Sequence, residues 1–376
     1  MNPVKKKVNF KEKPMSLIIK PLEACNFACT FCSSSYLVDD KKARLELEKI
    51  FAFLDRYPRT QNIFVVGGEP TLMPPSYYEE IISYIEENQM NTKVAMTSNL
   101  WDFYKNPGKW AALFAHPKME LCTSFQYGEG RQISPGKVFT EDYFIEIYNM
   151  YKERYPHKDL SFLAVIDESN AHTALDHVYL AKKLNTQCRL VAANASGRQQ
   201  KAYPISKMYK HYLEIYRKKL VPYEQTAIQL FDYMSGFGGG CDLSRTCDEQ
   251  IRSLNPDGRF FSCGPMNDDL DPENEIDFES EVIRGEGMYI PIQSRAFVRQ
   301  LKDECSSCEL FKLCNGCGKN VKDYKNQDIV ESHCSDMLSI KDDLLEMFNS
   351  DYIKEIKTQI DLYDAPLKVL GEYAKG

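Results

Sequence analysis

The sequence has no long apolar run, no export signal and no excess of positive charge. A membrane span needs ~18 apolar residues in a row, and a secretory signal needs an apolar core near the start of the chain. Both absences argue against a membrane or exported protein and predict a cytoplasmic one. The net charge is −7, so no broad basic surface is available to hold phosphates, which argues against a general nucleic-acid binder.

Common catalytic signatures are also missing. The six histidines form no HExxH pattern, and there is no Ser-His-Asp arrangement and no Walker loop. What the chain does contain is cysteine, with thirteen in 376 residues. In a reducing compartment so many thiols are poor candidates for disulfides. Their clustering favours metal ligands instead.

Strand and helix patterns alternate along the first half of the chain. Such alternation predicts parallel βαβ units joined by right-handed crossovers. Six units form a partial (β/α)6 barrel, resembling part of a TIM barrel rather than a closed barrel of eight. The predicted strands are residues 16–22, 62–68, 93–98, 120–126, 160–166 and 188–193, and the predicted helices are 43–56, 77–88, 139–154, 170–183 and 206–219.

The character of the chain changes after residue 220. Periodicity weakens, and eight cysteines lie between residues 241 and 334. Helical patterns return in the last part of the chain. We therefore predict an α/β barrel domain over residues 1–220 and an irregular, cysteine-rich domain with C-terminal helices over residues 221–376.

Three cysteines follow the first predicted strand. Cys25, Cys29 and Cys32 form a Cys-x3-Cys-x2-Cys pattern in the segment EACNFACTFC. A structural zinc site usually takes four ligands, whereas three thiols on one short loop suit an iron–sulfur cubane with one open iron. Zinc ligation and unrelated core cysteines are the alternatives for this segment.

With Phe31 before the third cysteine, this pattern resembles the signature of the radical S-adenosylmethionine (SAM) enzymes. The resemblance implies a partial six-stranded barrel and a [4Fe-4S] cluster whose open iron binds SAM. It further implies that one electron cleaves SAM and that the resulting 5′-deoxyadenosyl radical abstracts a hydrogen atom from the substrate.

The family's GGEP motif has a match after the second strand, at Gly67, Gly68, Glu69 and Pro70. Two glycines and a proline by themselves indicate only a tight turn. By resemblance, the motif contacts the methionine amino group of SAM, and a carboxylate beside a cationic amine is chemically reasonable.

Other SAM contacts follow from strand ends. Ser124 occupies the position where relatives touch the ribose, although the acidic residue often found two positions later is Gln126 here. Asn99, after the third strand, and Val191, on the sixth, are further candidates. For all except Ser124, an ordinary strand-end residue is the competing interpretation.

The later cysteines resemble the SPASM extension of radical SAM enzymes, which carries two auxiliary [4Fe-4S] clusters. One departure is the spacing in CNGC, where relatives have three residues between the cysteines. A zinc ribbon is the alternative, but its pairs are usually farther apart. Cys122 and Cys188 remain as core residues. The resemblance assigns one cluster to Cys241, Cys247, Cys263 and Cys317, and the other to Cys305, Cys308, Cys314 and Cys334.

Enzymes of this kind mostly modify peptides. We therefore expect a maturase that installs an oxidative crosslink, a cyclophane or a thioether, in a ribosomally made precursor peptide. A flavodoxin or ferredoxin would supply electrons. Only 24 residues precede Cys25, so we expect leader recognition by the barrel mouth, the extension or another protein.

Two alternatives remain open. A sulfatase-maturase reaction that forms formylglycine is one, but its aspartate base directly follows the third cysteine of the extension, where this chain has Gly264. A non-catalytic iron–sulfur electron carrier or zinc scaffold is the other. The sequence leaves the catalytic base unknown, and the candidates at the barrel mouth are Glu129, Arg131, Asp167 and Glu168.

Overall fold

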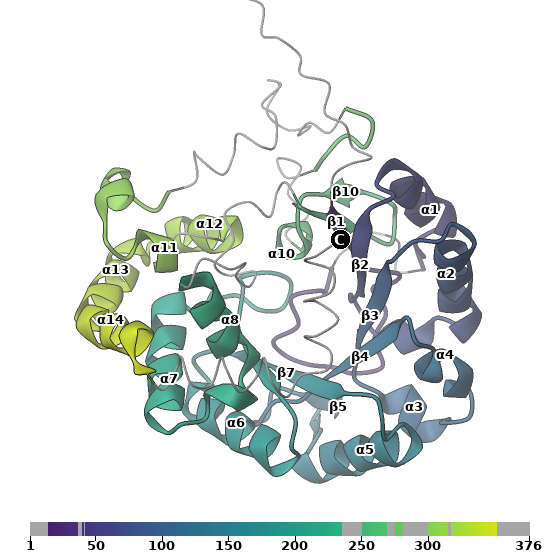
Figure 1. Ribbon diagram of the computed structural model, residues 1–376, viewed down its shortest axis with the longest axis horizontal. Coiled ribbons are helices and arrows are strands. Elements are labelled where there is room, and N and C mark those ends of the chain that lie inside the picture. Colours follow the sequence, from purple (N-terminus) through teal and green to yellow (C-terminus); the bar gives the residue numbers. More distant parts are fainter. Residues whose placement is uncertain are drawn as a thin grey trace, which may run out of the picture.

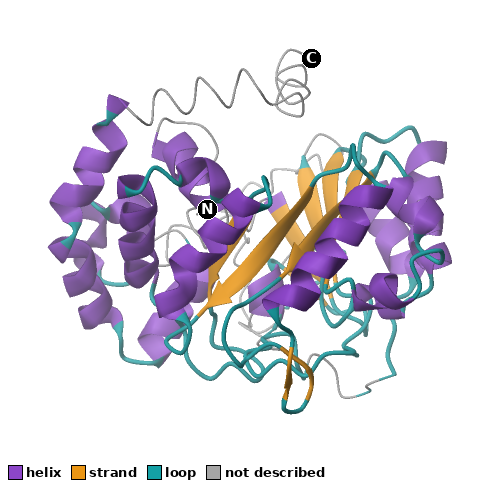
Figure 2. Cartoon of the chain, turned by 90° about the horizontal axis from the view of Figure 1, so that it is seen from below, coloured by secondary structure: helices purple, strands orange, loops and turns teal. Residues whose placement is uncertain are grey.

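A curved sheet lines the inside of the molecule and helices cover its outside (Figure 1). The computed structural model describes residues 14–36, 40, 42–234, 250–268, 275–280, 300–314 and 317–351. Within these ranges no helix is long and apolar enough to cross a membrane. Figure 2 shows the strands from another direction, with helices on both sides of them.

Six parallel strands form the predicted partial barrel. They are adjacent in chain order, apart from a two-stranded hairpin inserted after the fourth. Two of the six have the predicted bounds, and the others shift by a few residues. This arrangement confirms the partial (β/α)6 fold. The strands are β1 (Met15–Ile19), β2 (Thr60–Val65), β3 (Lys93–Ser98), β4 (Met119–Ser124), β7 (Leu160–Ile166) and β8 (Cys188–Ala192), and the hairpin is β5 (Gln132–Ser134) with β6 (Lys137–Val138).

Two later strands extend the sheet beyond β1. Strand β9 (Ile251–Leu254) pairs with β1 in parallel, and β10 (Phe260–Phe261) pairs with β9 in the antiparallel sense. The edge of the barrel sheet is thus completed by residues from the predicted second domain. The division at residue 220 stays a prediction.

Helices pack on the outer face of the sheet because successive strand residues point to opposite faces. In β7, Leu160, Phe162 and Ile166 are buried, while Leu163 and Val165 on the other face line a cavity inside the barrel. Burial of each large apolar side chain contributes about 1.5–3 kcal/mol. The outer helices are α1 (Leu47–Arg56), α2 (Pro75–Glu87), α3 (Trp101–Lys105), α4 (Ala111–Ala115), α5 (Glu141–Arg154), α6 (Ala174–Lys183), α7 (Ile205–Arg217) and α8 (Gln225–Met234).

Helices form the described part of the predicted C-terminal helical region, and residues 352–376 lie outside the described residues. Helices α13 and α14 lie beside α7 (Figure 1). The Tyr209 hydroxyl of α7 donates to the Leu313 carbonyl at 2.7 Å. The cysteine-rich part is therefore packed directly on the barrel. Its helices are α10 (Gly264–Asn267), α11 (Phe311–Cys314), α12 (Gly318–Asn326), α13 (Val330–Ser339) and α14 (Lys341–Asn349).

Candidate functional site

The first three cysteines lie on the loop that leaves β1. Two other loops hold it in place. The Ala28 and Thr30 amides donate to the carbonyls of Gln132 and Gly130 at 2.8 and 2.9 Å, and the Arg198 amide donates to the Cys32 carbonyl at 2.9 Å. Because the loops after β4 and β8 carry these partners, the barrel fixes the path of the cysteine loop.

All three thiols border one cavity of about 290 Å³ inside the barrel. Most of the predicted SAM-binding residues border it too, whereas Pro70 and Val191 do not. Pro70 is buried, and its carbonyl accepts from the Tyr78 hydroxyl at 2.8 Å. The residues that line the cavity are Cys25, Phe27, Cys29, Phe31, Cys32, Ser33, Ser34, Val66, Gly67, Gly68, Glu69, Thr97, Ser98, Asn99, Ser124, Phe125, Gln126, Arg131, Leu163 and Val165.

The thiols are in surroundings that disfavour bare negative charge. Protein atoms close around Cys25 raise its pKa to about 12, with the Glu69 carboxylate adding to the effect. Burial, and then Cys29 and Asp268, raise the pKa of Cys32 to about 11. Because these pKa values are raised, a thiolate at either position needs a nearby positive charge. A bound metal supplies that charge and stabilises the deprotonated ligand.

No group of three or more histidine, cysteine, aspartate or glutamate side chains in the described part of the chain is arranged around a single metal ion. An iron–sulfur cubane makes a different demand, since each thiolate bonds its own iron atom. Three thiols spread along one cavity wall fit that demand. The assignment of Cys25, Cys29 and Cys32 as cluster ligands stays a prediction.

The GGEP segment lies against the start of the cysteine loop. The Gly68 amide donates to the Leu22 carbonyl at 3.0 Å, and the Glu69 amide donates to the Ala24 carbonyl at 2.9 Å. A Cβ on Gly68 would come within 2.2 Å of the Ala24 oxygen. Gly67 has a φ of +111°, a conformation that favours glycine. The motif thus lets two backbones approach closely.

The Glu69 carboxylate joins the ends of β2 and β3. It accepts from the Thr71 amide at 3.0 Å, the Thr71 hydroxyl at 2.6 Å, the Ser98 hydroxyl at 2.6 Å and the Asn99 amide at 2.8 Å. Only 2% of the residue is exposed. Four donors therefore hold this side chain at the cavity wall, and its predicted contact with the SAM amino group stays a prediction.

Asn99 connects this wall to the cysteine loop. Its side-chain amide donates to the Asn26 side-chain oxygen at 2.7 Å, and its own oxygen accepts from the Trp101 amide at 2.9 Å. A residue expected to contact SAM from a strand end also has a clear positioning role here.

Arg131 is the cation of the cavity. Its guanidinium lies 5.3 and 5.5 Å from the ring centroids of Phe27 and Phe139, and it donates to the Ser124 hydroxyl at 2.6 Å. Its Nε atom is buried without a hydrogen-bond partner among the described residues, and so is Oε1 of Gln126. Buried polar atoms without partners are costly in an empty protein. Arg131 and Gln126 thus give the lining of the cavity a polar character that suits a polar ligand.

The other barrel-mouth candidates do not line this cavity. Glu168 forms an ion pair with Lys207. Asp167 accepts from the amide and hydroxyl of Ser169 at 2.8 and 2.6 Å, and no described contact places Glu129 there. Sequence position alone gave no means of separating Arg131 from these three, because its place depends on two phenylalanines from other segments.

His177 supports the loop that carries Arg131. Its Nε2 atom accepts from the Tyr127 amide at 3.1 Å, and Nδ1 lies 2.8 Å from the Thr173 carbonyl. Since Nε2 faces an N–H group, the ring is neutral with the proton on Nδ1. Burial lowers the pKa of His177 to about 4.

We expect this histidine to make the protein acid-sensitive. Between pH ~6.5 and ~4 the unfolded chain binds a proton that folded His177 does not, so stability falls as the pH decreases. The loss reaches about 3 kcal/mol at pH 4. Urea unfolding across this range should show a shallower pH dependence for His177→Gln than for the wild type, and equal slopes would contradict the assignment.

The later cysteines are only partly described. Cys241 and Cys247 lie outside the described residues. Cys263, Cys305 and Cys317 are buried, while Cys308, Cys314 and Cys334 are partly buried. Burial raises the pKa of Cys334, and the nearby Cys305 and Cys308 thiols raise it further. The grouping of the auxiliary-cluster ligands stays a prediction.

Comparisons with known sequences give the chain its relatives. Residues 19–129 match the Radical SAM superfamily. The chain is 20% identical over 365 residues to the cysteine-type anaerobic sulfatase-maturating enzyme of Clostridium perfringens. The aligned region covers 85% of this chain and 92% of that enzyme. Over 110 residues it is 34% identical to the GTP 3′,8-cyclase of Photorhabdus laumondii, covering 27% and 31% of the two chains.

Solved structures share the fold. Native anSMEcpe with bound AdoMet has a TM-score of 0.63 and 16% identity, covering 90% of this chain and 100% of that one. Streptococcus suis SuiB bound to precursor peptide SuiA has a TM-score of 0.54 and 17% identity, covering 82% and 72%. At these identities the likeness establishes the fold.

Proposed function

We propose that this chain, which contains a radical SAM domain, is a maturase for a ribosomally made precursor peptide. It binds SAM in the barrel cavity and modifies the peptide oxidatively. The cavity carries the proposal: it brings the three cysteines, the GGEP segment and an incompletely bonded Arg131 to the C-terminal ends of parallel strands. That edge is where parallel barrels place their chemistry.

The described residues fit the groups that this activity needs. Cys25, Cys29 and Cys32 would hold the [4Fe-4S] cluster, which when bound supplies the electron for reductive cleavage of SAM. Hydrogen bonds of Asn99 and Glu69 hold the cysteine loop and the segments after β2 and β3 in fixed positions relative to one another. Arg131, with its buried unpartnered Nε, would hold the SAM carboxylate.

Peptides are the proposed substrates because related folds are seen with them. One solved structure is native anSMEcpe with AdoMet and the Cp18Cys peptide, and another is SuiB with its precursor peptide. An oxidative crosslink, a cyclophane or a thioether, is the product that we propose. Two auxiliary [4Fe-4S] clusters held by the later cysteines would accept the substrate electron, and a flavodoxin or ferredoxin would reduce the first cluster.

Formylglycine formation is the second candidate. The relative from Clostridium perfringens spans 85% of this chain, which favours it. Gly264, where that reaction calls for an aspartate, weighs against it. Mass spectrometry after hydrazide treatment separates the two. A crosslink and an aldehyde made from serine each remove two hydrogen atoms, whereas an aldehyde made from cysteine gives a different mass, and only an aldehyde reacts with a hydrazide.

The decisive experiment is anaerobic. Purified protein, reconstituted with iron and sulfide, reduced and given SAM, should release 5′-deoxyadenosine, and a peptide encoded beside its gene should lose two hydrogen atoms in mass. An electron carrier or zinc scaffold would release none. Absence of 5′-deoxyadenosine from fully reconstituted protein would refute the proposal.

Replacing Arg131 with methionine should weaken SAM binding about 10- to 100-fold, the range expected when a hydrogen bond to a charged group is lost. Equilibrium dialysis with labelled SAM measures the change. The matched control is Arg154→Met, at an exposed position at the end of α5. Equal affinities in the two variants would show that Arg131 does not hold SAM.

A further inference from the structure

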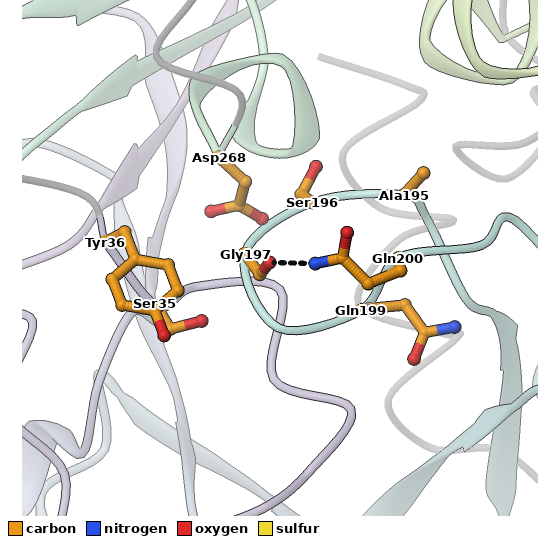
Figure 3. A pocket seen from close by; sticks show the side chains of 8 residues that line it. All are labelled: Ser35, Tyr36, Ala195, Ser196, Gly197, Gln199, Gln200 and Asp268. Carbon is orange, nitrogen blue, oxygen red and sulfur yellow. Dashed lines mark hydrogen bonds between the residues drawn. The ribbon is translucent and has the colours of Figure 1, made fainter. Parts of the chain in front are cut away.

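A second cavity lies at the end of the cysteine loop, where Ser35 and Tyr36 line it (Figure 3). Its volume is about 340 Å³, within the range of sites that bind small groups. Three segments far apart in the sequence form it: the end of the cysteine loop, the loop after β8, and the residue after α10. The lining residues are Ser35, Tyr36, Ala195, Ser196, Gly197, Gln199, Gln200 and Asp268.

Consecutive residues of the cysteine loop line the two cavities. Ser33 and Ser34 line the first cavity, while Ser35 and Tyr36, the next residues, line the second. Gly197, which lines the second cavity, lies directly against this loop, because a Cβ there would come within 2.4 Å of the Ser33 oxygen and 2.7 Å of the Cys32 oxygen. A molecule in the second cavity therefore lies beside the loop that holds the first.

The described contacts hold the Asp268 side chain through one of its two carboxylate oxygens. Its Oδ1 atom accepts from Lys20 in an ion pair and from the Ser34 hydroxyl at 3.2 Å. The Lys20 and Asp268 side chains are 2% and 9% exposed, and Lys20 also donates to the Gly264 carbonyl at 3.0 Å. The pair is thus anchored and electrically balanced, and no described hydrogen bond uses Oδ2.

The remaining lining groups are uncharged. Figure 3 shows the Asp268 carboxylate and Ser196 beside the turn at Gly197, with Gln200 donating across that turn to the Gly197 carbonyl at 3.1 Å. Since the Lys20 ammonium already balances the Asp268 charge, an ion bound here would gain little electrostatic free energy. A neutral group that donates a hydrogen bond to Oδ2 suits the cavity best.

We propose that this cavity binds a neutral, hydrogen-bond-donating residue of the peptide substrate, with Asp268 as the acceptor. The proposal rests on the proposed peptide-modifying function. Its location supports it, because α10 directly follows Cys263, a predicted ligand of the first auxiliary cluster. A peptide residue held here lies beside both the cysteine loop and the segment that leaves Cys263.

The test uses full-length, reconstituted protein with SAM and a displayed library of random-sequence peptides as the probe. Selected peptides should bind Asp268→Asn about 10- to 100-fold more weakly than the wild type. Gln200→Ala, which removes another side chain of the cavity lining, should also weaken binding. Glu80→Gln, a charge change at an exposed position on α2, is the matched control and should not alter affinity. Gln200 is exposed, so its variant guards against misfolding of Asp268→Asn.

A coupling measurement identifies the bonded residue. Alanine replacement of the donor residue in a selected peptide should weaken binding to the wild type and leave binding to Asp268→Asn nearly unchanged. Failure to select any peptide, or equal affinity of the wild type and both cavity variants, would overturn the proposal. Release of 5′-deoxyadenosine, measured separately without peptide, shows whether the enzymatic function itself stands.

Discussion

Replacing Cys29 with serine is expected to abolish the release of 5′-deoxyadenosine. Cys29 borders the barrel cavity together with Cys25 and Cys32, and a cubane with one open iron has no spare protein ligand at this site. If two auxiliary clusters are also present, bound iron should fall by about a third. Iron and sulfide assays, with chromatographic detection of the nucleoside, measure both effects.

Cys122→Ala is the control for this variant. Cys122 lies on β4 and is absent from the cavity wall, and its thiol contacts the Thr123 carbonyl. Its removal should leave the iron content and SAM cleavage unchanged. A Cys29→Ser protein that still cleaves SAM, or a Cys122→Ala protein that loses iron, would contradict the assignment of the first cluster.

Gly68→Ala should have the second largest effect. The new Cβ would lie 2.2 Å from the Ala24 oxygen and 2.3 Å from the Glu23 oxygen. Neither backbone can move freely, because hydrogen bonds join Gly68 to Leu22 and Glu69 to Ala24. Overpacking of this kind costs about 1–3 kcal/mol. We expect a lower melting temperature and at least tenfold weaker SAM binding.

Gly108→Ala separates a steric effect from a general effect of replacing glycine. No heavy atom lies within 4 Å of a Cβ at Gly108, so this variant should melt and bind SAM as the wild type does. Calorimetry and equilibrium dialysis on the two variants make the comparison. Normal SAM affinity in Gly68→Ala would show that the close approach of the two backbones does not shape the cavity.

The barrel could be predicted from sequence because its signals are local. Strands β3 and β7 begin and end where their apolar, alternating runs do. Strands β9 and β10 were not predicted, since four and two residues carry too little periodicity. Pairing of β9 with β1 depends on contact between distant segments, which no local pattern reports.

Some residues of the site could also be predicted from sequence, while others could not. Gly68, Asn99 and Ser124 could be placed at the cavity because parallel strands end at a common edge. The position of Arg131 depends on packing against Phe27 and Phe139, and that of Asp268 on Lys20 at the end of β1. Such contacts between separate segments are set by tertiary structure. The sequence therefore gave Arg131 only as one of four candidates and did not point to Asp268.

The pairing of β1 with β9 has a consequence for biosynthesis. Strand β1 precedes the cysteine loop, yet the neighbour that covers its outer edge, Ile251–Leu254, leaves the ribosome only after the other parallel strands have been made. Until then the nascent chain exposes one unpaired edge of β1, a template for association with other chains. Translation must therefore pass the start of the cysteine-rich region before the first strand is shielded.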